Sequence, residues 1–210
     1  MKKPVITLDG PAGAGKSTVA RLVAQRLGLR HLDTGAMYRA ITWKAQKRGL
    51  RDPAAIADMA AQTVLIVEPE RVTCDGVDVT RAIREPQVTA AIRVVADSPA
   101  CRAQLVRMQR EIGKEGGLVT EGRDQGSVVF PDAEFKFYID ASVDVRARRR
   151  HQEQGGDLDE IRRSIEKRDT EDRSRPVGAL VKPPGAIVLD TSGLTLDEVV
   201  ARILAAVGSP

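Results

Sequence analysis

Residues 5–27 read VITLDGPAGAGKSTVARLVAQRL and decide the fold of the chain. Within them, Gly10 to Ser17 match the pattern Gly-x-x-x-x-Gly-Lys-Ser. The apolar run at 5–8 predicts a buried strand, and an apolar face after the glycines predicts a helix that ends at Gly28. That face consists of Val19, Leu22, Val23 and Leu27. This order predicts a phosphate-binding loop (P-loop) in an α/β fold, whose core is a parallel sheet flanked by helices.

The expected loop can bind the phosphates of a nucleoside triphosphate. Gly10, Gly13 and Gly15 have no Cβ atom, so the backbone can pass close to a polyphosphate. The loop amides and the N-terminal end of the following helix form an anion site. We expect Lys16 to reach the β- and γ-phosphates and the Ser17 hydroxyl to ligate Mg²⁺. The expected nucleotide-binding residues are Gly10, Pro11, Ala12, Gly13, Ala14, Gly15, Lys16, Ser17 and Thr18.

The composition fits a single domain of 210 residues, with 42% hydrophobic residues to form its core. Aromatic residues make up only 3%, which disfavours a base-stacking surface for single-stranded nucleic acid. The net charge is +4, and 24 of the 33 basic residues are arginine. This bias suits bidentate binding of phosphate, and it equally fits a genome that favours arginine codons.

No apolar run reaches the ~18 residues of a membrane span. The first residues lead straight into the predicted strand and leave no room for a signal peptide, so we expect a cytoplasmic protein. Cys74 and Cys101 lack metal-binding spacing and are expected to be reduced thiols. His31 and His151 are isolated, which favours structural or surface roles.

Signals for helices and strands continue along the chain. Asp33-Thr34-Gly35 starts a helix that is expected to reach Lys47. Further helices are expected over 52–62, over 86–112 with a break at Ser98–Pro99, from Ser142 to Gly155, over 158–175, and from the Thr195–Glu198 capping box to Val207. Strands are expected over 118–124, 134–140 and 186–190. Pieces at 64–67, 71–74 and 77–79, with a turn at Asp75-Gly76, predict a small antiparallel insert.

The segment 158–175 carries a dense pattern of opposite charges. Its Arg168, Asp172 and Arg175 share one helical face at spacing i, i+4, i+7. On composition alone, a solvated helix with ordinary ion pairs is the favoured interpretation.

Four motifs together resemble the bacterial cytidylate (CMP) kinases. They are DGPAGAGKS at 9–17, DTGAMYR at 33–39, EGRDQGSVVFP at 121–131 and RDTEDRSR at 168–175. The resemblance extends from end to end, and the antiparallel pieces resemble the insertion that marks the bacterial members of the family. It changes the interpretation of the charged helix from a solvated face to part of a lid over ATP.

The resemblance implies a role for each matching residue. The implied CMP-binding residues are Thr34, Arg39, Arg102, Arg123, Asp124, Arg168, Asp172 and Arg175. Among them, Arg39, Arg123 and Arg175 match residues that contact the CMP phosphate, Arg168 and Asp172 the ribose, and Arg102 and Asp124 the cytosine. The implied catalytic residues are Lys16, Arg123 and Arg175, and the implied metal ligand is Ser17. Asp33 and Glu121 are weaker metal candidates, acting through water.

The resemblance also implies a single kinase domain over 1–210 with three parts. The core is expected at 1–35, 114–150 and 177–210. A monophosphate-binding lobe is expected at 36–113, with the β insert at about 63–86. A helical lid is expected at 151–176.

The implied base contacts agree with the chemistry of cytosine. A carboxylate such as Asp124 can accept from the exocyclic N4 amine, and Arg102 can donate to O2 or N3. Uracil would instead direct its O4 acceptor at that carboxylate and leave buried polar groups mispaired. At the aligned Arg93, the family commonly has a serine that contributes to base recognition, so the preference for CMP over UMP is left open.

The expected reaction is transfer of the γ-phosphate of ATP, bound with Mg²⁺, to CMP or dCMP. A kinase for another small acceptor, such as UMP, AMP or shikimate, remains the nearest alternative. A regulatory GTPase would carry an Asn-Lys-x-Asp motif, which the sequence lacks. A nucleic-acid-binding protein could use the basic residues at 146–150, but these lack aromatic neighbours. We expect a monomer with ATP and CMP or dCMP as its partners, and neither nucleic acid nor membrane.

Overall fold

The computed structural model describes residues 3–208 of the chain. The chain forms two compact units, one comprising Met1–Arg30 with Gly116–Pro210 and the other comprising His31–Glu115. The predicted P-loop belongs to the first unit and the predicted antiparallel insert to the second.

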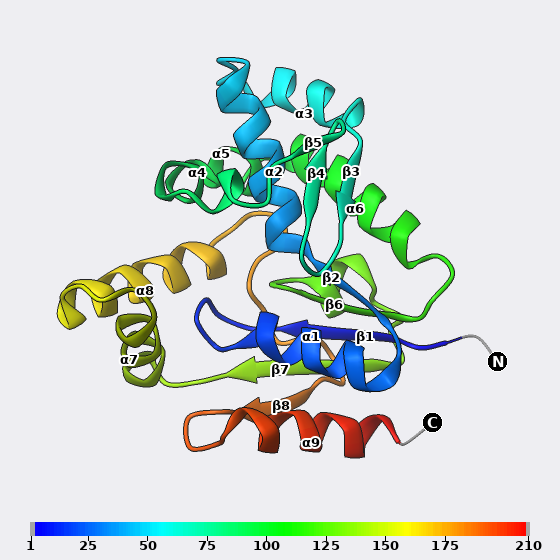
Figure 1. Cartoon of the computed structure of the whole chain (residues 1–210), viewed down its shortest axis with the longest axis vertical. Helices are drawn as coiled ribbons and strands as arrows, with labels where there is room; N and C mark the ends of the chain where they lie inside the picture. The colour runs from blue at the N-terminus through cyan, green and yellow to red at the C-terminus, as the bar shows by residue number, and fades with distance from the viewer. Residues whose placement is uncertain (1–2, 209–210) are drawn as a thin grey trace. The chain divides into compact units, whose positions relative to one another are not determined.

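The first unit is built around a parallel sheet (Figure 1). Its strands are β1 (Val5–Asp9), β6 (Leu118–Gly122), β7 (Phe135–Asp140) and β8 (Ile187–Asp190). The sheet order is β2-β6-β1-β7-β8, in which β2 (Arg30–Asp33) begins at the last residue of this unit's first segment. β1 pairs in parallel with β6 and β7, and all of its residues are buried. Gly10 therefore begins the P-loop at the carboxyl edge of the sheet, where open α/β sheets bind ligands.

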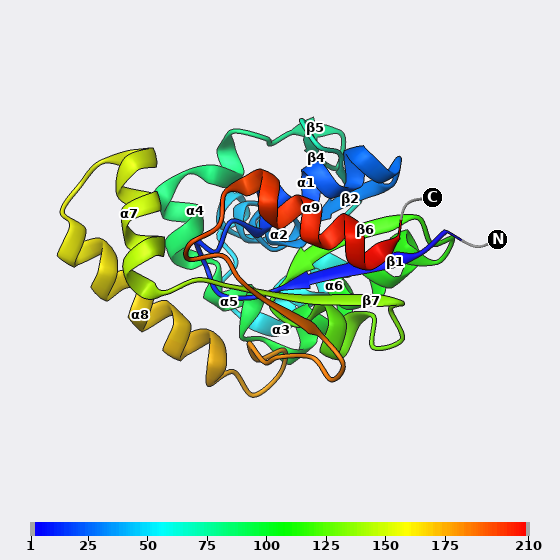
Figure 2. The same cartoon turned by 90° about the horizontal axis from the view of Figure 1, so that it is seen from below.

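Helices α1 (Lys16–Leu27) and α9 (Leu196–Val207) pack together on one face of this sheet (Figure 2). Their shared core includes Ile6, Leu8, Val19, Val23, Phe137, Ile139, Val199 and Ile203. Because successive side chains of a strand alternate between faces, Thr7 and Asp9 point to the face opposite to that of Ile6 and Leu8.

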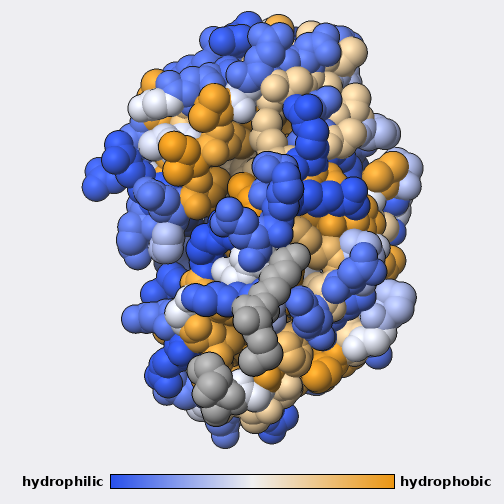
Figure 3. Space-filling model, turned by 90° about the vertical axis from the view of Figure 1, so that its right-hand side faces the viewer, coloured by the Kyte–Doolittle hydropathy of each residue, from blue (hydrophilic) through white to orange (hydrophobic). Residues whose placement is uncertain are grey.

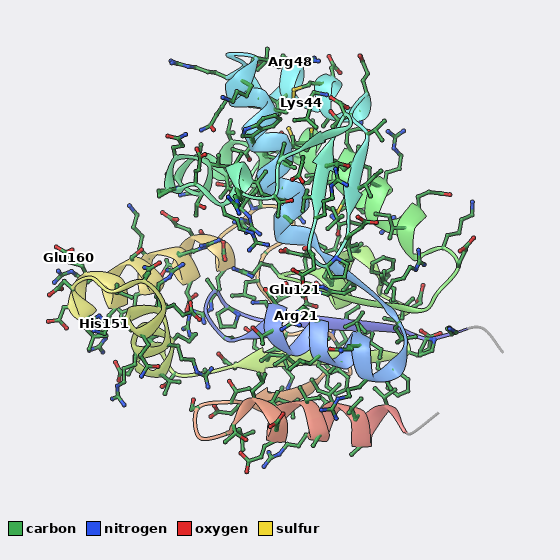
Figure 4. All side chains as sticks on the ribbon, viewed as in Figure 1. Arg21, Lys44, Arg48, Glu121, His151 and Glu160 are labelled. Atoms are coloured by element: carbon green, nitrogen blue, oxygen red, sulfur yellow. The ribbon has the colours of Figure 1, made fainter. Side chains whose placement is uncertain are left out.

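Helices α7 (Val143–Gln154) and α8 (Leu158–Arg173) pack against each other through a separate apolar cluster (Figure 1). The cluster consists of Val143, Ala147, Ile161 and Ile165. Ser142 and Asp157 cap the two helices by accepting hydrogen bonds from the amides of Val145 and Glu160. Figure 4 places His151 and Glu160 at the outer end of this pair, and the His151 ring contacts the carbonyl of Gly156 through Nδ1 (2.8 Å).

The second unit combines helices with a small antiparallel sheet. Its helices are α2 (Thr34–Lys47), α3 (Pro53–Ala61), η1 (Ala82–Arg84), α4 (Pro86–Ala91), α5 (Arg93–Ala96) and α6 (Pro99–Gly113). Its strands β3 (Leu65–Val67), β4 (Val72–Cys74) and β5 (Val77–Asp78) confirm the predicted meander. Asp75 and Gly76 both have positive φ, at 50° and 80°, which confirms the predicted Asp-Gly turn.

A buried lysine connects α2 to this sheet. Lys44 donates from Nζ to the Thr63 hydroxyl (2.7 Å) and pairs with Asp75 (2.5 Å). Figure 4 shows Lys44 on α2, and the side chain is only 8% exposed. The two partners compensate for burial of the ammonium group, because an unpaired buried charge would be strongly destabilising.

Most of the predicted elements are confirmed, including the helix caps at Asp33, Ser98, Ser142 and Thr195. Three features are not predicted. The strand β2 has the sequence Arg-His-Leu-Asp, which buries only Leu32 fully and has no apolar run. The π-helical turn η2 (Gln125–Val129) has no periodic signal because it is a single turn. The helix expected over 86–112 breaks at Ile92 as well as at Ser98.

The surface shown in Figure 3 has apolar residues interspersed with hydrophilic ones. Among residues 3–208, no helix combines the length and the hydropathy needed to cross a membrane.

Candidate active site

The P-loop in the first unit has the backbone that its glycines predict. Gly10, Gly13 and Gly15 have φ values of 147°, 79° and 84°, which side-chain-bearing residues rarely adopt. A Cβ atom at Gly10 would also lie 2.0 Å from the carbonyl oxygen of Ile139 on β7. The loop therefore turns tightly over the end of the sheet and requires glycine at its first position.

Lys16 is the first residue of α1 and is 5% exposed. Its Nζ donates to the carbonyl oxygen of Pro11 (2.7 Å), so the side chain folds back over the loop. Burial, followed by the positive charge of Arg123, lowers the pKa of Lys16 to about 7. Glu121 and Asp9 oppose this shift. A buried cation with few compensating charges is suited to receive an anionic ligand.

Ser17 and Thr18, two of the residues predicted to bind the nucleotide, are exposed at the start of α1. Over the described range 3–208, no group of three or more His, Cys, Asp or Glu side chains could hold a metal ion. The exposed Ser17 hydroxyl and oxygens of the nucleotide phosphates together would form the donor set for Mg²⁺. This donor set fits Mg²⁺, which is commonly bound by few protein ligands together with substrate phosphates.

Arginines of the predicted acceptor site gather around one carboxylate in the first unit. Asp172 on α8 accepts from Nε of Arg123 (2.7 Å) and pairs with Arg175 (2.6 Å). Burial alone would raise the pKa of Asp172, but the charges of Arg123 and Arg175 outweigh burial and lower it. Burial and then Arg123 lower the pKa of Arg168 to about 10. Such a concentration of positive charge favours binding of an anion.

Asp124 follows Arg123 directly and is 4% exposed. Its backbone carbonyl accepts from the amides of Val128 (2.9 Å) and Val129 (3.1 Å), which closes the turn η2. The structure thus brings Arg123, Asp124, Arg168, Asp172 and Arg175 into the same unit as Lys16.

The remaining predicted acceptor residues, Thr34, Arg39 and Arg102, lie in the second unit. Asp33 caps α2 by accepting from the amide of Ala36 (2.8 Å), and it pairs with Arg39 (3.2 Å). The guanidinium of Arg102 lies over the ring of Tyr38, 5.6 Å from its centroid. Thr34 is buried in the first turn of α2, while Arg39 and Tyr38 follow within the next turns.

Arg93 lies on α5, where its Nε donates to Asp97 (2.8 Å). This ion pair joins residues four apart on the surface, with side chains 51% and 28% exposed.

Sequence reasoning gave no role to three buried charged residues. Arg146 on α7 pairs with Asp169 on α8 (2.6 Å) and donates to the P-loop carbonyl of Ala12 (3.0 Å). Asp9 accepts from two backbone amides of η2. The only sequence signal was that Asp9 and Asp169 lie inside the quoted motifs, because their partners are distant in the chain.

A strand, P-loop and helix with a buried lysine, in one unit with a cluster of arginines, define a P-loop phosphotransferase. The sequence profile of the family described as cytidylate kinase matches residues 6–209. The chain belongs to the cytidylate kinase family, as the four motifs predicted.

Two relatives and one solved structure illustrate the similarity. The cytidylate kinase of Desulfitobacterium hafniense (strain Y51) is 46% identical over 97% of this chain and 93% of its own length. A bifunctional pantoate ligase/cytidylate kinase of Synechococcus sp. (strain JA-2-3B'a(2-13)) is 49% identical over 97% of this chain. The chain spans only 40% of the length of that bifunctional relative. A shikimate kinase from Acinetobacter baumannii in complex with shikimate shares the fold, with a TM-score of 0.50 at 17% identity, over 98% of this chain and 93% of that chain.

Proposed function

We propose that this chain transfers the γ-phosphate of ATP to CMP and dCMP, forming ADP and CDP or dCDP. The observation that carries the proposal is electrostatic. Arg123 pairs with Asp172. Among the charged neighbours of Lys16, Arg123 also has the largest effect on the pKa of the lysine, which it lowers. A guanidinium whose charge acts on Lys16 is suited to stabilise, together with that lysine, the charge of one transferred phosphoryl group. Membership of the cytidylate kinase family supports cytidine nucleotides as acceptors.

The proposed mechanism depends on positioning and charge stabilisation. The P-loop residues bind ATP, and Ser17 contributes a ligand to Mg²⁺, which neutralises phosphate charge. An oxygen of the acceptor phosphate attacks the γ-phosphorus in line. Lys16, Arg123 and Arg175 stabilise the charge on the transferring group. A strong general base is unnecessary because the acceptor phosphate is already largely ionised at pH 7.

We also propose that acceptor binding replaces an internal ion pair. Asp172 pairs with both Arg123 and Arg175, at distances of 2.7 and 2.6 Å. A dianionic phosphate can satisfy the same donors, which frees the carboxylate to accept from a ribose hydroxyl. Arg168 would donate to the ribose, and Thr34 and Arg39 are further proposed contacts of the acceptor. The family resemblance supports these roles.

The family resemblance also supports a separate role for each segment of the chain. We propose that 151–176 act as a lid over ATP and that 36–113 form the monophosphate-binding lobe. Lid closure would exclude water and suppress ATP hydrolysis. The resemblance also supports a cytoplasmic monomer without a nucleic-acid partner, and size-exclusion chromatography with light scattering tests the monomer.

A coupled assay with a panel of acceptors tests the proposed function. ATP·Mg²⁺ is supplied with CMP, dCMP, UMP, AMP or shikimate, and ADP release is measured. CMP and dCMP should give the highest kcat/KM. A higher value for UMP, AMP or shikimate would replace the proposal with a kinase for that acceptor.

Asp124→Ala should reduce the preference for CMP over UMP. The carboxylate is proposed to accept from cytosine N4, whereas uracil has an acceptor at that position. We expect kcat/KM for CMP to fall about 10²-fold and that for UMP to fall several-fold less. The measurement is the ratio of the two values in the same assay. Equal losses for both acceptors would argue against base reading by Asp124.

ATP binding should be accompanied by proton uptake at Lys16. The ammonium form is favoured by phosphate, so its pKa rises from about 7 when ATP binds. At pH 8 the free lysine is mostly neutral and should take up close to one proton, while at pH 6 it is already charged. Calorimetry with ATP·Mg²⁺ in two buffers of different ionisation enthalpy measures this uptake. Lys16→Arg is the control because its guanidinium does not titrate, and uptake that persists in this variant would assign the proton to another group.

A further inference from the structure

Asp9 joins the start of the P-loop to the segment that carries Arg123. It is the last residue of β1, it is fully buried, and Gly10 follows it directly. Its two carboxylate oxygens accept hydrogen bonds from the amides of Gln125 and Gly126, each at 2.7 Å. These two amides follow Arg123 and Asp124 immediately in the chain. One side chain thus fixes the backbone next to both proposed acceptor contacts.

Neighbouring side chains seat the same segment on the sheet. Thr7 and Asp9 lie on the face of β1 opposite α1, and Thr120 on β6 is in register with Thr7. The Thr120 hydroxyl donates to the side-chain oxygen of Gln125 (2.9 Å). A Cβ atom at Gly126 would lie 2.7 Å from Oγ1 of Thr7. The chain can approach the strand this closely only because residue 126 is glycine.

We propose that Asp9 is a positioning residue that aligns Arg123 with the P-loop for phosphoryl transfer. The proposal rests on the phosphotransfer function given above. Asp9 is adjacent to Gly10 in the chain and holds Gln125 and Gly126 through hydrogen bonds, so it determines how the acceptor-side arginine lies relative to the donor-side loop. Transfer rates depend steeply on such alignment, since a displacement of about 1 Å can cost about 10²-fold.

The charge state of Asp9 suits this role. Burial raises its pKa to about 6 against the effect of the two amide hydrogen bonds. At pH 8 the carboxylate is therefore ionised, and both oxygens can accept. An asparagine in its place would offer one acceptor and would direct its NH₂ group at the second backbone amide. The shape of the side chain would be kept while half of the contact becomes unfavourable.

The test compares Asp9→Asn with a matched control, Asp140→Asn. Asp140 ends the neighbouring strand β7, and its side chain accepts from the adjacent amide of Ala141 (2.8 Å) instead of from an amide of residues 123–126. At pH 8, Asp9→Asn should lower kcat/KM for CMP by about 10²-fold, mainly in kcat, while the control should stay within about twofold. The dissociation constant for ATP should change little in both variants. Wild-type kinetics in a folded Asp9→Asn protein would overturn the proposal.

A double-mutant cycle with Arg123 shows whether Asp9→Asn acts by misaligning Arg123 or by a general loss of structure. If Asp9 acts through Arg123, Asp9→Asn should cost less than about threefold in an Arg123→Ala background. Full additivity of the two substitutions would overturn the proposal. Gly126→Ala provides a second variant that displaces the same amides without changing a charge. It should reproduce the kinetic loss even if Asp9→Asn fails to fold, and unchanged kinetics in Gly126→Ala would also contradict the proposal.

An NMR measurement without substrate tests the role of Asp9 whichever acceptor the enzyme uses. The Nε proton of Arg123 is bonded to Asp172 and should give a protected ¹⁵N NMR signal in the ligand-free protein. Asp9→Asn or Gly126→Ala should broaden or shift this signal, whereas Asp140→Asn should leave it in place. An unchanged signal would overturn the proposal. If the unsubstituted protein fails to phosphorylate CMP, the proposed function fails and this signal still decides the role of Asp9.

Discussion

Replacing Arg123 with alanine is expected to lower kcat/KM for CMP by about 10²-fold or more. The Arg123 side chain is 18% exposed and pairs with Asp172, and its positive charge lowers the pKa of Lys16. It therefore lies among the groups that would stabilise charge on the transferred phosphoryl group. Loss of such a contact costs several kcal/mol in the transition state and less in the ground state. The reduction should be concentrated in kcat, as measured by coupled ADP release.

Arg202→Ala is the matched control for this substitution. Arg202 is an exposed arginine on α9 in the same unit, so the change removes the same charge outside the site. Its kcat/KM should stay within about twofold of the unsubstituted value. A value within about threefold for Arg123→Ala itself would remove Arg123 from the catalytic site.

Replacing Arg146 with methionine is expected to destabilise the chain by about 3–5 kcal/mol. The Arg146 and Asp169 side chains are only 2% and 3% exposed, and their contacts are bidentate at 3.1 and 2.6 Å. Removal of the guanidinium leaves a buried carboxylate without its cation. The carbonyls of Ala12 and Ala141 also lose a donor. Urea unfolding followed by circular dichroism measures the free energy of unfolding.

An exposed ion pair between the same two helices provides the control. Arg162 on α8 lies 3.3 Å from Asp144 on α7, with both side chains about half exposed. Arg162→Met should cost less than ~1 kcal/mol, since exposed pairs contribute little. The double variant Arg146→Met/Asp169→Leu should recover much of the loss because no unpaired charge remains. A cost below ~1 kcal/mol for Arg146→Met would contradict the importance of this buried pair.

The Arg146 substitution should also weaken ATP binding. Arg146 donates to the carbonyl of Ala12 inside the P-loop, and a Cβ atom at Gly13 would lie 3.5 Å from the Cβ of Arg146. The Arg146 side chain therefore contacts the P-loop backbone at Ala12, lies close to Gly13 and helps to hold the conformation of the loop. Its partner Asp169 lies beside Arg168 and one turn before Asp172 on α8. The same ion pair thus connects the P-loop to the helix that carries Arg168 and Asp172, which are proposed to bind the acceptor.

Local sequence patterns correctly predicted those features whose physical cause lies within a few neighbouring residues. The glycines of the P-loop, the cap at Asp33 and the Thr195–Glu198 capping box act over three to five residues, and all are confirmed. The Asp75-Gly76 turn is another such case. The strand β2 was missed because its burial depends on its place at the sheet edge, while its sequence is mostly polar.

The sequence by itself therefore determined the P-loop, most helices and strands, and, through four motifs, the family of the chain. The tertiary structure alone decided which charged groups meet. Asp9 accepts hydrogen bonds from Gln125 and Gly126, which follow it by 116 and 117 positions in the sequence. Arg123 and Asp172 are separated by 49 positions, and Arg146 and Asp169 by 23. Periodicity and capping act within a few residues, whereas these contacts depend on which strands are neighbours in the sheet and on how α7 and α8 pack together.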